Sequence, residues 1–140
     1  MLDTKVAILI KNLALIFDKM AIPVLAPYEL TPSQFKVIKY LLRHRGEDIR
    51  QREIEVAYSM TNPTVTGILN NLEKNGWAMR VENENDARSK LVRLTEKSLS
   101  QERELYAVGE RLEHEFTAVL SEAEYEELKA LLQKLFHSLT

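Results

Sequence analysis

Residues 50–95 constrain the fold most, because two short helical patterns there are followed directly by two β-rich runs. The first helix is predicted over residues 50–58. After a tight turn, the second is predicted to begin at Asn62, a typical N-cap residue, with Pro63 at its first position. Gly76 is expected to end it. This spacing is typical of a helix–turn–helix.

The β-rich runs are "WAMRVE" and "KLVRLT", separated by the polar, turn-prone "NENDARS". They predict a β-hairpin with a long tip, in which Trp77, Met79 and Val81 share one face. A helix–turn–helix followed at once by a hairpin is typical of a winged helix. The predicted fold class is therefore mainly α with a small β-hairpin wing.

The rest of the chain is predicted to be helical. Apolar residues at helical spacing indicate a helix over residues 4–20, broken by Pro23 and Pro27. "TPSQ" and "SEAE" have the capping-box pattern and open helices that run from about 31 to 44 and from 121 onward. After the hairpin, a single long helix is expected, with Thr95 as its N-cap, and it precedes the helix that begins at "SEAE".

The apolar stripes at the two chain ends are wider than one small lobe can bury. An intramolecular core is one explanation, but these stripes lie far in sequence from the winged helix, so an intertwined homodimer accounts for them better. We therefore treat residues 1–140 as a single domain. Residues 1–22 and 96–140 are assigned to a helical dimerisation region, and residues 31–95 to the winged-helix lobe.

Composition excludes several classes of function. The chain has 140 residues, no cysteine and 45% hydrophobic residues, so disulfides and thiolate sites are ruled out. We find neither a secretory signal nor a run of roughly 20 apolar residues, which favours the cytoplasm and no membrane span. Net charge is −2, but the acidic residues are concentrated after residue 95, so an anionic partner should meet the middle of the chain.

The predicted second helix of the helix–turn–helix has one unusual face. Opposite its apolar side lie short, mostly uncharged residues. An ordinary solvated helix would carry Glu and Lys at these positions. Short polar side chains let a helix lie deep in the DNA major groove, where hydroxyls and amides can bond base edges and phosphates. A plain surface helix is the alternative. The residues of this face are Pro63, Thr66, Gly67, Asn70, Asn71 and Lys74, with Thr64 at its flank.

The predicted hairpin tip favours a DNA-binding role over the alternative of a plain surface helix. Asp86 lies two residues before Arg88, where a carboxylate can hold a guanidinium in a bidentate pair and fix its direction. An arginine directed from a loop tip suits a narrow minor groove. A solvated turn would give the same short pattern by chance, but helix, hairpin and tip arginine in this order are much rarer.

These motifs resemble those of MarR-family transcriptional regulators over essentially the whole chain. "IRQREIEVAYSMTNPTVTGILNNLEKNGW" resembles the family's helix–turn–helix, and "RVENENDARSKLVRLTEKS" its wing. The resemblance implies a homodimer that binds double-stranded DNA, with terminal helices interleaved and Arg88 in the minor groove. Gly67 departs from the larger polar residue of many relatives. The DNA-contacting residues implied are Arg50, Gln51, Asn62, Pro63, Thr64, Thr66, Asn70, Arg80, Arg88 and Lys90.

The resemblance also implies a mechanism: repression by occupying a near-palindromic promoter site, with release by a small-molecule effector. Candidate effector-binding residues are Phe17, Met20, Tyr40 and Tyr106, although core packing explains each of them as well. No cofactor is expected. His114 lies near Glu110, Glu113 and Glu115 but lacks a second histidine, so no metal site is expected.

Two other classes of function were weighed. No nucleophile–histidine–acid arrangement and no glycine-rich phosphate loop occurs, so the chain is not expected to be an enzyme and no catalytic residue is assigned. A helical dimer that binds proteins and has lost DNA binding is the remaining alternative. The small, neutral face of the second helix favours DNA.

Overall fold

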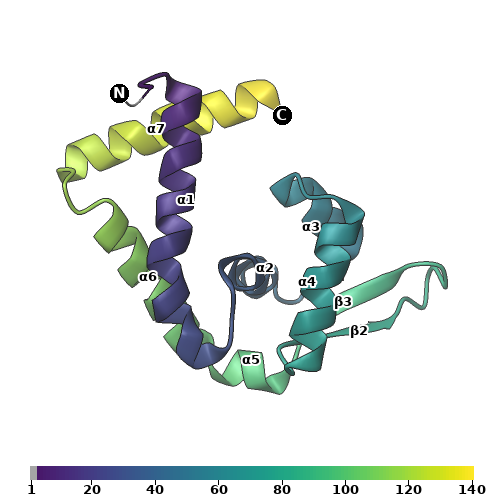
Figure 1. Ribbon diagram of the computed structural model, residues 1–140. Helices are drawn as coiled ribbons and strands as arrows, with labels where there is room; N and C mark the ends of the chain where they lie inside the picture. Colours follow the sequence, from purple (N-terminus) through teal and green to yellow (C-terminus); the bar gives the residue numbers. More distant parts are fainter. Residues whose placement is uncertain (1–2) are drawn as a thin grey trace.

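The structure, a computed structural model, describes residues 3–140 and is mostly helical with one small antiparallel sheet (Figure 1). The winged-helix fold class predicted from the sequence is confirmed. In chain order the elements are α1 (Val6–Leu25), a short 3₁₀ helix (Ala26–Tyr28), α2 (Pro32–Arg43), β1 (Ile49–Arg50), α3 (Gln51–Tyr58), α4 (Asn62–Lys74), β2 (Ala78–Glu82), β3 (Lys90–Leu94), α5 (Glu96–Ser100), α6 (Glu102–Phe116) and α7 (Glu122–Leu139).

The first helix is longer than predicted. α1 continues through Pro23 to Leu25, so the expected break at Pro23 is wrong. A proline lacks the backbone N–H that would bond one turn back, so Pro23 removes one hydrogen bond from the last turn. Ala21 and Leu25 are almost fully buried in the core on either side of Pro23, and this packing holds the last turn helical. The chain turns only at the 3₁₀ helix that follows.

The helix–turn–helix forms as predicted, but its cap lies one residue earlier. The Thr61 hydroxyl accepts the backbone N–H of Thr64, so Thr61 is the N-cap of α4 and Asn62 is already helical. The expectation that Asn62 caps this helix is therefore wrong. Between α3 and α4, Ser59 adopts a left-handed conformation with φ of 52°, which turns the chain sharply.

The sheet has one strand more than the predicted hairpin. β2 pairs antiparallel with β3, and the two-residue β1 pairs with the other side of β3, giving the order β1-β3-β2. Two residues give too short a pattern to read as a strand. Ala78 and Val92 face the core, whereas Met79, predicted to share a face with Trp77 and Val81, is 42% exposed.

The predicted long helix after the wing is two helices. α5 ends at Ser100, and Gln101 interrupts the helix with φ of −104° and ψ of 12° before α6 begins. The buried Ser98 hydroxyl donates to the carbonyl oxygen of Trp77, and the Thr95 hydroxyl donates to the carbonyl of Gly76. These bonds tie α5 to the chain segment that follows α4.

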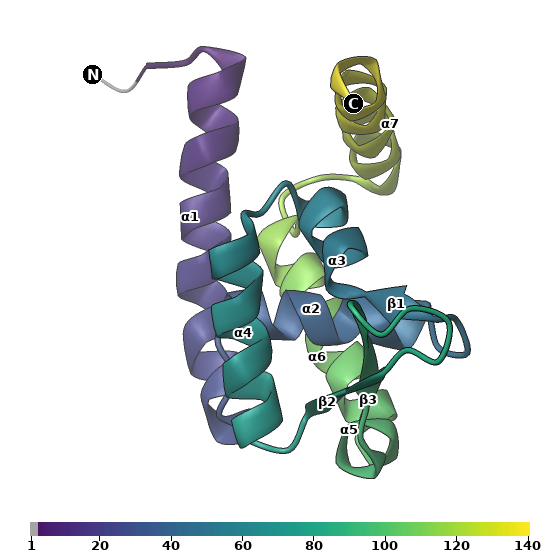
Figure 2. The same ribbon diagram turned by 90° about the vertical axis from the view of Figure 1, so that its right-hand side faces the viewer.

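The hydrophobic core lies within the winged-helix lobe, where α2, α4, the sheet and the last part of α1 meet α6. The first half of α1 and all of α7 extend to one end of the molecule, away from this core (Figure 2). No residue of α7, all of which the structure describes, is buried. Among residues 3–140, none of the helices is long and apolar enough to span a membrane.

Candidate DNA interface

The exposed face of α4 carries the residues expected from the sequence. Val65, Ile68, Leu69 and Leu72 are buried against the lobe, so the opposite side of the helix faces outward. Pro63, Thr64, Gly67 and Asn70 are exposed there and Thr66 is half-buried. A Cβ added at Gly67 would meet nothing within 4 Å, so this part of the face is open. The helix therefore presents a small polar surface to solvent.

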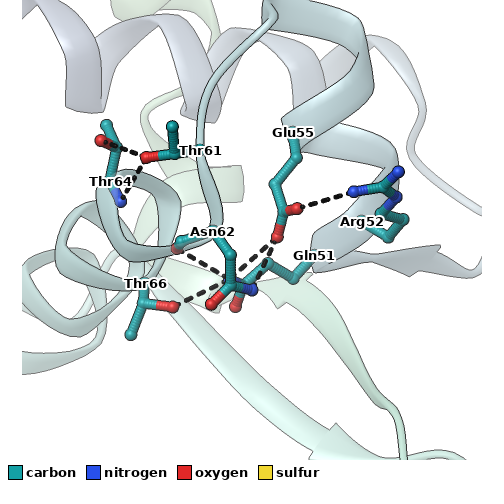
Figure 3. A network of polar contacts seen from close by, with 7 residues as sticks. All are labelled: Gln51, Arg52, Glu55, Thr61, Asn62, Thr64 and Thr66. Carbon is teal, nitrogen blue, oxygen red and sulfur yellow. Dashed lines mark hydrogen bonds and ion pairs between the residues drawn. The ribbon is translucent and has the colours of Figure 1, made fainter.

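A buried carboxylate joins α3 to the start of α4 (Figure 3). Glu55 is only 6% exposed, and its Oε2 accepts Nδ2 of Asn62 at 2.9 Å and Nε2 of Gln51 at 3.2 Å. Gln51 Nε2 also lies 2.9 Å from the Thr66 hydroxyl oxygen. Arg52 approaches the second carboxylate oxygen at 3.4 Å. Side chains from both helices thus converge on one acceptor group.

This network keeps Glu55 charged. The hydrogen bond from Asn62 lowers the pKa of the Glu55 carboxyl most, and Gln51 and Arg52 add to it, whereas desolvation acts in the opposite direction. A buried carboxylate is favourable only when its oxygens are hydrogen-bonded, and these donors meet that requirement. Sequence analysis assigned Gln51 and Asn62 to DNA and did not detect Glu55. The signal available was an i,i+4 pair, Gln51 and Glu55, on the side of α3 that faces the turn.

A second polar cluster connects the middle of α4 to β2. Glu73 accepts the backbone N–H of Arg80 at 3.0 Å and approaches the Arg80 guanidinium at 3.4 Å. The same guanidinium donates to Oδ1 of Asn70. The hydrogen bond from Arg80 lowers the pKa of Glu73. Arg80 and Asn70 were both predicted to contact DNA, and here they orient each other at the edge of the α4 face.

At the wing tip the arginine side chain is almost fully exposed. The Arg88 side chain is 96% exposed, and its Nε lies 3.8 Å from Asp86 Oδ1. The same Oδ1 instead accepts the backbone N–H of Arg88 at 3.0 Å. The predicted bidentate pair is therefore wrong: a carboxylate two residues before an N–H closes a local turn more easily than it reaches a long side chain. Asp86 shapes the loop rather than aiming the guanidinium.

A concavity of about 670 Å³ joins these groups between α3, the start of α4 and the wing. It brings together six of the ten predicted DNA-contacting residues; the other four lie on α4. Each cation in it has a carboxylate within 4 Å, which weakens but does not cancel its field. Arg52, which also lines the concavity, is not among the residues predicted from the sequence. The basic residues that line the concavity are Arg50, Arg52, Arg80, Arg88 and Lys90.

The four candidate effector-binding residues lie in different surroundings in the folded structure. Phe17 packs edge-on against Phe116, and Tyr40 stacks near His44 and Tyr58. Met20 lines an open pocket of about 610 Å³ beside α6. Tyr106 is 38% exposed on α6. These positions leave the assignment of an effector site a prediction.

Comparison with known proteins agrees with this arrangement. The model of the MarR family matches residues 30–90. The chain is 36% identical over 109 residues to the uncharacterized HTH-type transcriptional regulator YwoH of Bacillus subtilis (strain 168), which covers 78% of this chain and 77% of that protein.

Two solved structures that resemble this chain are complexes with DNA. The structure of a MepR–DNA complex from S. aureus superposes with a TM-score of 0.86 at 26% identity, over 97% of this chain and 99% of that one. A mutant of MarR from E. coli in complex with operator DNA superposes with a TM-score of 0.81 at 30% identity, over 91% and 90% of the two chains. On these grounds the chain belongs to the MarR family of transcriptional regulators.

Proposed function

We propose that the protein is a transcriptional repressor that binds a near-palindromic promoter site as a homodimer and is released by a small-molecule ligand. Membership of a family of regulators agrees with the expectation that the chain is not an enzyme. The observation that carries the proposal is the concavity with five cationic side chains beside the small polar face of α4. Its relatives MepR and MarR of E. coli have been solved with DNA, and the MarR complex contains operator DNA.

The concavity and α4 suit different parts of a duplex. α4 offers hydroxyls, amides and a bare backbone at Gly67, which fit the floor of a major groove. The arginines and Lys90 line the adjoining concavity, where positive charge would attract the sugar–phosphate backbone without reading sequence. Arg88 lies in the exposed loop of the wing, and an adjacent minor groove would attract such a cation.

A homodimer is supported by the apolar surface that the single chain leaves uncovered. Leu128, Leu132, Leu135 and Phe136 on α7 are between 42% and 55% exposed. Apolar patches of this extent mark protein interfaces in water-soluble chains. A two-fold dimer places two α4 helices against one duplex, so its target should contain two inverted half-sites about one helical turn apart.

Ligand release is supported by the open pocket that Met20 lines. Its walls are mostly apolar, with Val24, Tyr28 and Val108, and Arg111 and Glu115 supply charge at one side. It lies between α1 and α6, which connect the lobe to the uncovered terminal helices. A ligand there that fits one spacing of the lobes better than another would shift the dimer away from the DNA-binding form.

The proposal is tested by fluorescence anisotropy with the region upstream of the protein's own gene. We expect tight binding at low salt that weakens steeply toward physiological salt, because phosphate contacts release counterions. Arg52→Ala combined with Arg88→Ala should abolish most of the binding, whereas Arg103→Ala on α6, outside the concavity, should not. Affinity that does not vary with salt, or the same loss in the control, would instead support a protein-interaction module.

A further inference from the structure

The buried Glu55 carboxylate fixes which way two neighbouring amides point. An ionised carboxylate only accepts hydrogen bonds, so both amides must turn their NH₂ groups toward it. Asn62 Nδ2 and Gln51 Nε2 do so, at 2.9 and 3.2 Å. The usual ambiguity between the oxygen and nitrogen of an amide is therefore removed here by chemistry. The carbonyl oxygen of each amide is left to face elsewhere.

Asn62 lies at the concavity proposed to bind DNA. Asn62 is exposed in the first turn of α4 and lines the concavity. Within residues 3–140, its side chain makes its hydrogen bond through Nδ2 alone. The NH₂ group of Asn62 is thus engaged with Glu55, and Oδ1 remains available as an acceptor on a residue that lines the concavity.

DNA offers few partners for a fixed acceptor. Phosphate and sugar oxygens accept hydrogen bonds and would repel Oδ1. In the major groove, the donors are the exocyclic amino groups of adenine (N6) and cytosine (N4), while guanine and thymine present only acceptors and a methyl group at the corresponding edge. An acceptor held toward the groove floor therefore discriminates between bases.

We propose that Glu55 is a positioning residue that makes Asn62 a reader of one amino-bearing base, adenine or cytosine, in each half-site. This inference rests on the proposed function, because it requires α4 to enter the major groove. Glu55 itself touches no DNA: it is buried beneath the two amides and acts through them. Without it, Asn62 would rotate freely and could donate to guanine, thymine or phosphate as readily as it accepts.

The experiment is selection from a library of random duplexes, with sequencing of those retained by the purified protein. The wild type should enrich an inverted repeat with adenine or cytosine at one position of each half-site. Asn62→Ala should lose the preference at that position only, a change of about 5- to 150-fold in relative affinity. Glu55→Gln should lose it as well, since glutamine can donate or accept. Glu47→Gln, an equivalent change outside the interface, should retain it.

A second arm changes the DNA instead of Glu55, so it does not depend on how a Glu55 variant folds. Replacing the preferred base in the selected duplex with an analogue that lacks the exocyclic amino group should weaken wild-type binding, and should not affect Asn62→Ala. Melting curves and light scattering establish that each variant folds and assembles as the wild type does.

The outcomes separate the inference from the proposed function. If the wild type enriches no duplex, both are overturned. If it enriches an inverted repeat but Asn62→Ala keeps every base preference and only weakens binding uniformly, Asn62 contacts the backbone and this inference alone is wrong. If Asn62→Ala loses the preference but a folded Glu55→Gln keeps it, Glu55 has no positioning role.

Discussion

Replacing Arg88 with alanine tests the wing most directly, because the structure separates its effect on binding from any effect on folding. The side chain is 96% exposed and its nearest carboxylate contact is at 3.8 Å, so the melting temperature should not change. A direct arginine contact to DNA contributes about 1–3 kcal/mol. A dimer carries two wings, so the minimum expected loss is about 2 kcal/mol, or roughly 30-fold in affinity.

The salt dependence gives a second magnitude. Five basic side chains line the concavity of each protomer. If all of them met phosphates in a dimer, the logarithm of affinity would fall against the logarithm of salt with a slope of about −9. Arg88→Ala removes one of the five from each half, so the slope should become less negative by about 2. Anisotropy titrations at several salt concentrations measure both quantities.

Asp86 separates two explanations of the same loop. Because its Oδ1 bonds the backbone N–H of Arg88, Asp86→Asn should preserve the loop and the affinity, while Asp86→Ala should lose part of both. If the Asp86 carboxylate instead orients the Arg88 guanidinium, Asp86→Asn and Asp86→Ala should lose DNA affinity to the same extent. An Arg88→Ala dimer that binds the selected duplex within about threefold of the wild type, well short of the loss expected for a direct contact, would show that the wing does not read DNA.

Three further outcomes are expected. Leu135→Asp places a carboxylate on the uncovered face of α7 and should give a monomer of 16.2 kDa by light scattering, where the wild type has twice that mass. Ser98→Ala removes a buried donor to the Trp77 carbonyl and should reduce the free energy of unfolding in urea by about 1 kcal/mol. The depressed pKa of Glu55 adds stability that is complete above its unfolded value of about 4.3 and is lost as pH falls through the lower folded value. The stability difference between wild type and Glu55→Gln should therefore narrow below about pH 4.3, as urea unfolding at several pH values would measure.

The sequence predicted the elements whose signals are local. Capping boxes opened α2 and α7 where expected, since Thr31 and Ser121 each satisfy a free N–H three residues on. The errors arose where tertiary contacts outweigh a local rule. Pro23 did not end α1, because Leu25 beyond it is buried in the core. The helix after the wing is interrupted at Gln101, shortly after Ser98, whose hydroxyl bonds to a residue 21 positions away.

The candidate site shows the same division. Its exposed members, such as Pro63, Thr64 and Arg88, were predicted from their residue types and from the α4 face. Arg52 and Glu55 were missed, because their importance depends on which helix lies opposite them. A concavity between α3, α4 and the wing exists only after the chain has folded, so no spacing in the sequence describes it.

Asn62 shows what such a missed partner changes. From sequence it is a polar residue at a helix start, and two roles, cap or DNA contact, fit equally well. The structure removes the first, because Thr61 is the cap. The structure also restricts the second role, that of a DNA contact. The buried Glu55 carboxylate accepts the hydrogen bond of the Asn62 NH₂ group, so the carbonyl oxygen of the amide is the group left available. If α4 reads DNA as proposed, the chemical polarity of Asn62 is set by a buried neighbour that makes no contact with the duplex. A substitution at Glu55 should therefore alter which base is preferred, even though every exposed residue of α4 remains the same.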